Sequence, residues 1–193
     1  MGMRSIGIAR ISLFYLIMGA LGACGILDAY FSHGVLPTDQ DWWAFVKSLG
    51  LGVFIGLTLV CLSRLLVMRF AWARTLSEEF KVLLGPLNGK EIALLAGLSG
   101  VAEELLFRGV LQPALGLWLT SAIFGLVHVG PNRRFLPWTF MAAVAGLCFG
   151  VALHITGSLV APVVAHFTIN YLNLRHLVLE KELTYIGVAG CSS

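Results

Sequence analysis

The chain has 193 residues, of which 58% are hydrophobic and only 12% are charged, and its mean hydropathy is +0.88. A soluble domain of this length needs more polar residues to cover its surface, so the composition excludes that class and predicts an all-α integral membrane protein. The modest net charge of +3 gives no sign of nucleic-acid binding. Because no stretch resembles a linker or a low-complexity segment, we expect a single integral membrane domain over residues 1–193.

Residues 1–68 are predicted to contain two membrane helices, at 11–31 and 43–68. Each apolar run reaches the length of about 20 residues that a membrane span requires. The segment that joins them contains Asp28, Asp39 and Asp41 but neither lysine nor arginine. We therefore expect this segment on the side of the membrane opposite the cytoplasm.

Residues 69–89 have a different pattern. Apolar side chains recur at helical spacing, while Arg74 and Glu78 lie four residues apart on the polar side. This pattern predicts an amphipathic helix lying on the cytoplasmic interface, and a polar loop with some apolar residues is the alternative. The apolar positions are Phe70, Ala73, Leu76, Phe80, Leu83 and Leu87.

Residues 90–180 are predicted to form the helical core of a functional site. The second of its helices is short and needs burial by its neighbours. We expect the first to break near Gly109 and Pro113, because proline interrupts a helix and the break would shape a cavity. The four expected helices cover residues 91–112, 115–129, 135–156 and 159–179, which gives six membrane helices in the whole bundle.

The cations predict the orientation of the bundle. Lysine and arginine concentrate in cytoplasmic loops, and nearly all of those in this chain fall on one side of the predicted helices. Lys47 is on the opposite side, and Arg108 is inside a helix. Both termini are therefore expected in the cytoplasm. The cations on the cytoplasmic side are Arg4, Arg10, Arg64, Arg69, Arg74, Lys81, Lys90, Arg133, Arg134, Arg175 and Lys181.

Pairs of small residues four positions apart predict where helices approach closely. Such spacing lets two backbones pack without bulky side chains between them. The pairs are Gly52 with Gly56, Ala96 with Gly100, and Gly146 with Gly150.

Six polar residues inside three predicted helices are candidates for chemistry. An ionisable group in a membrane helix costs several kcal/mol unless it faces a partner or water, so we expect all of them to converge in one polar pocket. Glu104 and Arg108 can pair on one helix face, while Glu103 points about 100° away from them. The full set is Glu103, Glu104, Arg108, His128, His166 and Asn170.

These residue types suit hydrolysis by an activated water. A carboxylate beside an imidazole can deprotonate water, and an imidazole and a carboxamide on one helix face, such as His166 and Asn170, can donate to an oxyanion. A buried Glu–Arg pair can also be purely structural. Glu103 and His128 are expected at different membrane depths, and they meet only if the helix that carries Glu103 begins well outside the hydrocarbon.

Three motifs in this order resemble the CPBP intramembrane proteases, the family that contains the type II CAAX prenyl endopeptidases and bacteriocin-processing proteins. EELLFR matches EExxxR, FGLVH matches FxxxH and HFTIN matches HxxxN. The resemblance covers roughly residues 90–175 and leaves out the first two helices. It implies that Glu103 and His128 activate the attacking water and that His166 and Asn170 stabilise the oxyanion. It makes Glu104 and Arg108 supporting residues.

The expected function is therefore that of an intramembrane glutamic endopeptidase acting near the cytoplasmic membrane surface of the lipid bilayer, without a cofactor. The resemblance implies a membrane-anchored, prenylated or C-terminally tagged peptide as substrate. A zinc protease with Glu103, His128 and His166 as ligands is an alternative, although HExxH is absent. A second alternative is a non-enzymatic immunity factor, scaffold or transporter that uses the same polar cluster structurally.

Overall fold

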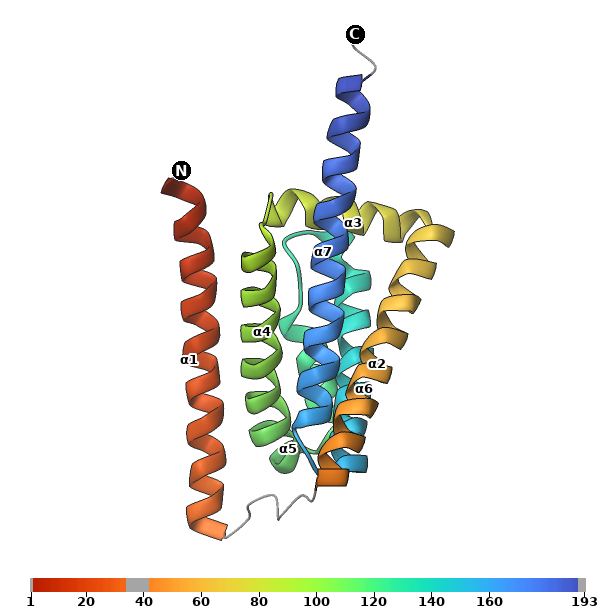
Figure 1. Ribbon diagram of the computed structural model, residues 1–193. Helices are drawn as coiled ribbons and strands as arrows, with labels where there is room; N and C mark the ends of the chain where they lie inside the picture. Colours follow the sequence, from red (N-terminus) through yellow and green to blue (C-terminus); the bar gives the residue numbers. More distant parts are fainter. Residues whose placement is uncertain (1, 34–41, 191–193) are drawn as a thin grey trace.

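The computed structural model describes residues 2–33 and 42–190, with side chains at 7–29, 31 and 42–179. Within these ranges the chain is helical and has no strand, as the composition predicts. Figure 1 shows the long helices side by side, with α3 across one end of the bundle. The elements are α1 (Gly2–His33), α2 (Trp42–Arg69), α3 (Ala71–Leu84), α4 (Gly89–Leu106), the π-helical turn η1 (Phe107–Leu111), α5 (Gln112–Val127), the 3₁₀ turn η2 (Arg133–Phe135), α6 (Leu136–Thr156) and α7 (Val160–Gly190).

Apolar helices long enough to cross a membrane make up most of this bundle. Four described stretches qualify by length and composition, and α7 runs beside α2 and α4 within the bundle. Together they confirm the predicted polytopic helical fold. The qualifying stretches are Gly7–Ala29, Trp42–Arg69, Gly89–Val127 and Arg133–Thr156.

The predicted interfacial helix is α3. Its Ala73 and Leu76 side chains are buried against the bundle. On its other side Glu79 pairs with Arg134 and accepts a hydrogen bond of 3.3 Å from Asn132. The hydrogen bonds from Arg134 and Asn132 hold the pKa of Glu79 below its ordinary value. These contacts fasten α3 to the segment that joins α5 and α6.

The break after α4 lies later than predicted. Instead of ending near Gly109 and Pro113, the helix continues through η1, and the backbone leaves helical geometry at Gly116, with φ 79° and ψ 169°. Glycine adopts this positive φ without steric cost. The π-helical turn η1 lies just before Pro113, because a proline inside a helix has no N–H to donate to the preceding turn and disturbs the regular hydrogen-bond ladder there. The reversal therefore depends on Gly116.

Beyond Gly116, α5 runs antiparallel to α4. The Phe107 and Phe124 rings lie 4.9 Å apart, and Glu103 and His128 meet farther along the same pair of helices. The predicted helix 115–129 begins and ends slightly earlier, as Gln112–Val127. Its part after Gly116 is about 16 Å long, only half of the hydrocarbon thickness.

The orientation of the bundle in the membrane stays a prediction. The start of α1 and the C-terminal part of α7 lie at the same end of the bundle as α3 in Figure 1. Asp39 and Asp41, expected on the opposite side, lie outside the described residues, as do the side chains of Arg4 and Lys181.

The small-residue pairs lie at close helix contacts. A Cβ atom added to Gly52 would come within 2.5 Å of the Ala161 carbonyl oxygen on α7, and one added to Gly56 within 2.6 Å of Thr168 Cβ. Ala96 is fully buried, and a Cβ on Gly100 would lie 3.1 Å from the Phe167 backbone nitrogen. Gly146 and Gly150 pack against side chains of η1 and α5 in the same manner, close to Arg108, Gln112, Leu117 and Phe124.

Replacing Gly56 with leucine is expected to destabilise the bundle by about 1–3 kcal/mol, because the side chain must displace α7. The measurement is thermal unfolding of the purified protein in detergent. Gly50→Leu is the matched control on the same helix, since a Cβ at Gly50 meets nothing within 4 Å. Equal unfolding temperatures for the two variants would contradict the packing described.

Candidate active site

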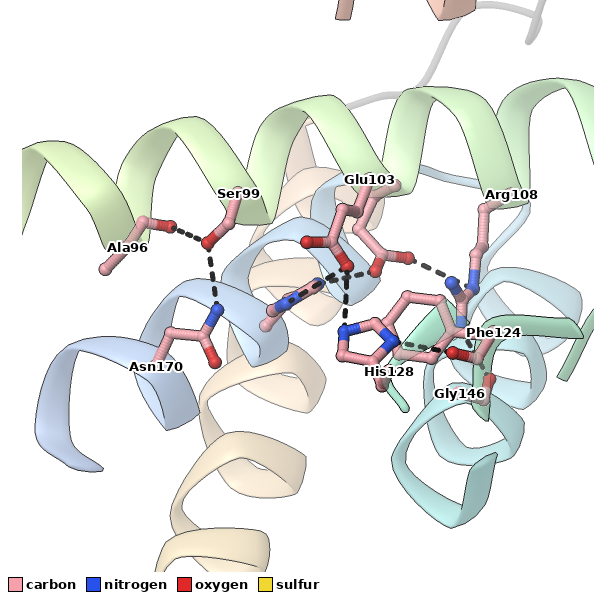
Figure 2. Close-up of polar contacts among 10 residues, drawn as sticks. Ala96, Ser99, Glu103, Arg108, Phe124, His128, Gly146 and Asn170 are labelled. Carbon is pink, nitrogen blue, oxygen red and sulfur yellow. Dashed lines mark hydrogen bonds and ion pairs between the residues drawn. The ribbon is translucent and has the colours of Figure 1, made fainter. Parts of the chain in front are cut away.

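Glu103 of α4 lies opposite two imidazoles that come from different helices. Glu103 Oε2 is 3.5 Å from Nε2 of His128 at the end of α5 and 4.0 Å from Nε2 of His166 on α7. Figure 2 shows the His128 ring turned towards this carboxylate. Glu103 Oε2 is buried and has no hydrogen-bond partner among the described residues. The three groups thus surround one point in the bundle interior.

Glu104 and Arg108 form the predicted i,i+4 pair, fully enclosed by protein. Arg108 Nε lies 3.1 Å from Glu104 Oε2, and both side chains have no exposed surface. The other oxygen, Glu104 Oε1, lies 2.7 Å from His166 Nδ1. Glu104 therefore connects the cation to the imidazole that faces Glu103.

The backbone and aromatic rings hold Arg108 in place. Its Nη2 donates a 2.7 Å hydrogen bond to the Gly146 carbonyl oxygen on α6. Its guanidinium carbon lies 4.5 Å from the centre of the Phe124 ring, a cation–π distance. Because Gly146 has no side chain, α6 can approach closely enough to accept this hydrogen bond.

The contacts of both imidazoles determine which ring nitrogen faces Glu103. His128 Nδ1 lies 2.6 Å from the Phe124 carbonyl oxygen, which can only accept, so this nitrogen carries the proton and donates. In the same way His166 Nδ1 donates to Glu104. The Nε2 atoms of both rings are consequently the ones that face Glu103.

Aromatic packing fixes the planes of both rings. His166 stacks on Phe149 with centroids 5.1 Å apart, and Trp138 meets His128 edge-on, also at 5.1 Å. Trp138 in turn packs edge-on against Phe80 of α3 at 5.1 Å. His128 is therefore linked through Trp138 to the helix that lies across the end of the bundle.

Asn170 is positioned differently from the expected convergence on a single point. Its Nδ2 donates a 2.9 Å hydrogen bond to Ser99 Oγ, one helical turn before Glu103 on α4. The Ser99 hydroxyl donates to the Ala96 carbonyl oxygen at 3.4 Å. Figure 2 shows Asn170 to the side of the Glu103–His128 pair. Sequence reasoning missed Ser99, which has no charge and lies among small residues that mark only packing.

A cavity of about 680 Å³ adjoins this cluster. Its walls include Ser99 and Asn170 beside the site, Tyr15 of α1, and residues of α3 such as Leu76 and Phe80. Most of the lining is apolar. The cavity thus extends from the carboxamide of Asn170 to the underside of α3.

Tyr15 is the second residue that sequence reasoning missed. Its hydroxyl group lies close enough to the Glu103 carboxylate to interact with it, and Tyr15 lines the cavity together with Ser99 and Asn170. The first helix carries no motif, and Tyr15 follows Phe14 within a long apolar run, so no sequence signal distinguished it.

No group of three or more His, Cys, Asp or Glu side chains suited to hold a metal ion occurs in the described parts of the chain. The ligands expected in the zinc alternative were Glu103, His128 and His166. These side chains lie near one another, but they are not identified as a group suited to hold a metal ion. His154 and His176 do not belong to this cluster.

Glu103 and His128 meet because they stand at similar distances along the chain on either side of the reversal at Gly116, which makes α4 and α5 antiparallel. Residues 128–132 then form the non-helical path to η2 beside α3.

Comparisons with known proteins agree with the motifs. The family profile described as type II CAAX prenyl endopeptidase Rce1-like matches residues 90–172. The uncharacterized protein YpbD of Bacillus subtilis is 40% identical over 79 residues, which cover 41% of this chain and 41% of that protein. The aligned part is thus about two fifths of the relative's length. No solved structure matches the chain.

Proposed function

Because residues 90–172 match the profile of the type II CAAX prenyl endopeptidase Rce1-like family, we propose that this integral membrane protein is a glutamic-type endopeptidase that cleaves a membrane-associated peptide. The observation that carries the proposal is the position of Glu103. Its buried Oε2 atom faces the Nε2 atoms of His128 and His166 at 3.5 and 4.0 Å and has no hydrogen-bond partner among the described residues. A water molecule bound there would meet a base and an imidazole together.

In the first step, Glu103 accepts a proton from this water while the water oxygen attacks the scissile carbonyl carbon. His128 orients the water, because its protonated Nδ1 is held by the Phe124 carbonyl and its Nε2 can accept a hydrogen bond. The new C–O bond turns the carbonyl oxygen into an oxyanion. When the C–N bond breaks, the proton held by Glu103 passes to the leaving nitrogen, and the carboxylate is regenerated.

Stabilisation of the oxyanion requires donors. His166 already donates from Nδ1 to Glu104, so it can donate from Nε2 only as an imidazolium. Glu104 is placed to balance that charge, and Arg108 in turn keeps Glu104 paired. The side chains then carry two positive charges, on Arg108 and His166, and two negative charges, on Glu103 and Glu104. Such a neutral set costs least in a low-dielectric interior.

Asn170 supplies a second donor in this scheme. One N–H of its carboxamide is bound to Ser99, and the other remains for the oxyanion at the wall of the cavity. Asn170 and His166 would thus approach the substrate carbonyl from two successive turns of α7.

The cavity supports an apolar peptide or a lipid-modified tail as substrate. Its mainly apolar lining favours an apolar segment, and its volume of about 680 Å³ lies within the range of ligand pockets. A prenylated or C-terminally tagged peptide anchored in the bilayer would lie along it, with the scissile bond near Asn170.

The test is cleavage by the purified full chain in liposomes of a farnesylated peptide ending in a CAAX sequence, followed by mass spectrometry. The same peptide without the prenyl group serves as the matched substrate. We expect cleavage that survives a strong chelator. Activity that disappears with the chelator and returns with zinc would favour the metal alternative. A folded protein that releases no new peptide terminus, here or in membranes of cells that express it, would favour the non-enzymatic one.

Ser99→Ala is expected to lower kcat about 10-fold, because Asn170 loses the hydrogen bond that orients its carboxamide. The cleavage assay described above provides the measurement. Ser121→Ala is the matched control, since the Ser121 hydroxyl bonds to the Leu117 carbonyl of its own helix, away from the site. The interpretation fails if Ser99→Ala and Ser121→Ala cleave at the same rate.

A further inference from the structure

The first helix lies against α4 beside the site. A Cβ atom added to Gly19 would be 3.4 Å from Ala102 Cβ, one added to Gly22 would be 2.8 Å from Leu105 Cβ, and one added to Gly25 would be 2.7 Å from Val110 Cγ2. The partners advance along α4 and into η1 as the glycines advance along α1, so the two helices run parallel. The absence of side chains on this stripe of α1 permits the close approach.

This packing brings Tyr15 to the level of the site. Tyr15 precedes Gly19 by one helical turn, which corresponds to a position on α4 near Ser99. Its side chain is half-buried and shares the cavity wall with Ser99 and Asn170. Its hydroxyl interacts with Glu103, although α1 lies outside the matched range 90–172.

We propose that Tyr15 is a positioning residue for Glu103, whose hydroxyl donates to the carboxylate and fixes the direction in which the carboxylate accepts a proton. A glutamate has two carboxylate oxygens, and Oε2 faces the two histidines without a hydrogen-bond partner among the described residues. In the proposed arrangement the phenol donates to Oε1. With Oε1 held, Oε2 stays aimed at the bound water. This inference rests on the proposed function, in which Glu103 is the base.

The contact itself can be tested without activity. Tyr15→Phe, Glu103→Ala and the double variant of the full chain are compared by thermal unfolding in detergent. We expect non-additive shifts, with a coupling of about 2–4 °C, because the second substitution has no hydrogen bond left to remove. Additive shifts overturn the proposal whatever the activity of the protein.

The positioning role is tested with the farnesylated CAAX peptide. Tyr15→Phe is expected to lower kcat about 10-fold with KM unchanged, because the carboxylate loses the donor that orients it. Tyr171→Phe is the matched control, on α7 and outside the site, where Tyr171 stacks on Phe167. Coupled unfolding with an unchanged kcat would make Tyr15 merely structural and overturn the proposal. Full activity of Glu103→Gln would instead overturn the proposed function.

Discussion

Glu103→Gln is expected to lower kcat for the peptide about 10²- to 10⁴-fold while the bundle stays folded. The amide has nearly the shape of the carboxylate but cannot accept the proton of the attacking water. Because Glu103 Oε2 has no hydrogen-bond partner among the described residues, the substitution removes no hydrogen bond of that oxygen. The measurement is single-turnover cleavage in liposomes, with the helical circular dichroism signal and the thermal midpoint recorded alongside.

Glu78→Gln is the control for this experiment. Glu78 is exposed on α3, where it pairs with Lys81 at 2.8 Å and lies away from the cavity. Its replacement should leave cleavage unchanged. His128→Ala should behave as Glu103→Gln does, since the water then has no partner opposite the carboxylate. If both site variants still cleave, the polar cluster serves the structure and the non-enzymatic alternative gains support.

Arg108→Met is expected to destabilise the bundle by about 3–5 kcal/mol, the largest effect on stability among the site residues. The substitution leaves Glu104, which has no exposed surface, without its cation. It also removes the hydrogen bond to the Gly146 carbonyl and the contact with the Phe124 ring. Unfolding in detergent, followed by circular dichroism against temperature or denaturant, measures the loss.

The matched comparison is the double variant Glu104→Gln with Arg108→Met. It removes the unpaired charge together with its partner, so it should be more stable than Arg108→Met alone. A double variant that is less stable than either single variant would show that the two side chains contribute independently rather than as a pair. Both variants should lose activity, because His166 depends on Glu104 for its charge balance.

Much of the fold followed from the sequence because its determinants are local. Long apolar runs predicted the spans, and the helical spacing of Ala73 and Leu76 predicted the amphipathic helix α3. The i,i+4 spacing of Glu104 and Arg108 placed them together on one helix face. Helical periodicity also placed Glu103 on a different side, where the structure has His128 and His166.

The parts that escaped prediction depend on contacts between distant segments. A Gly-Pro neighbourhood predicted the break near Gly109, but tertiary packing lets the helix continue as a π turn until Gly116 provides the positive φ. Tyr15 and Ser99 have no charge, so the cost of burying an ion, which identified the other site residues, does not apply to them. Asn170 was expected beside the carboxylate, but it bonds to Ser99 instead. Its i,i+4 spacing from His166 fixes the face of α7 on which it lies, but it does not fix which turn of α4 that face meets.

Lipid molecules beside α5 meet an apolar wall of about 16 Å after Gly116, formed by exposed side chains such as Trp118, Leu119 and Leu126. The hydrocarbon of a bilayer is about 30 Å thick, and local thinning of the membrane is one way to accommodate so short an apolar stretch. Headgroups and their hydration layer would then approach the end of α5. A reaction that consumes one molecule of water per peptide bond would take it from this thinned region of the membrane, next to His128, instead of from across a full leaflet.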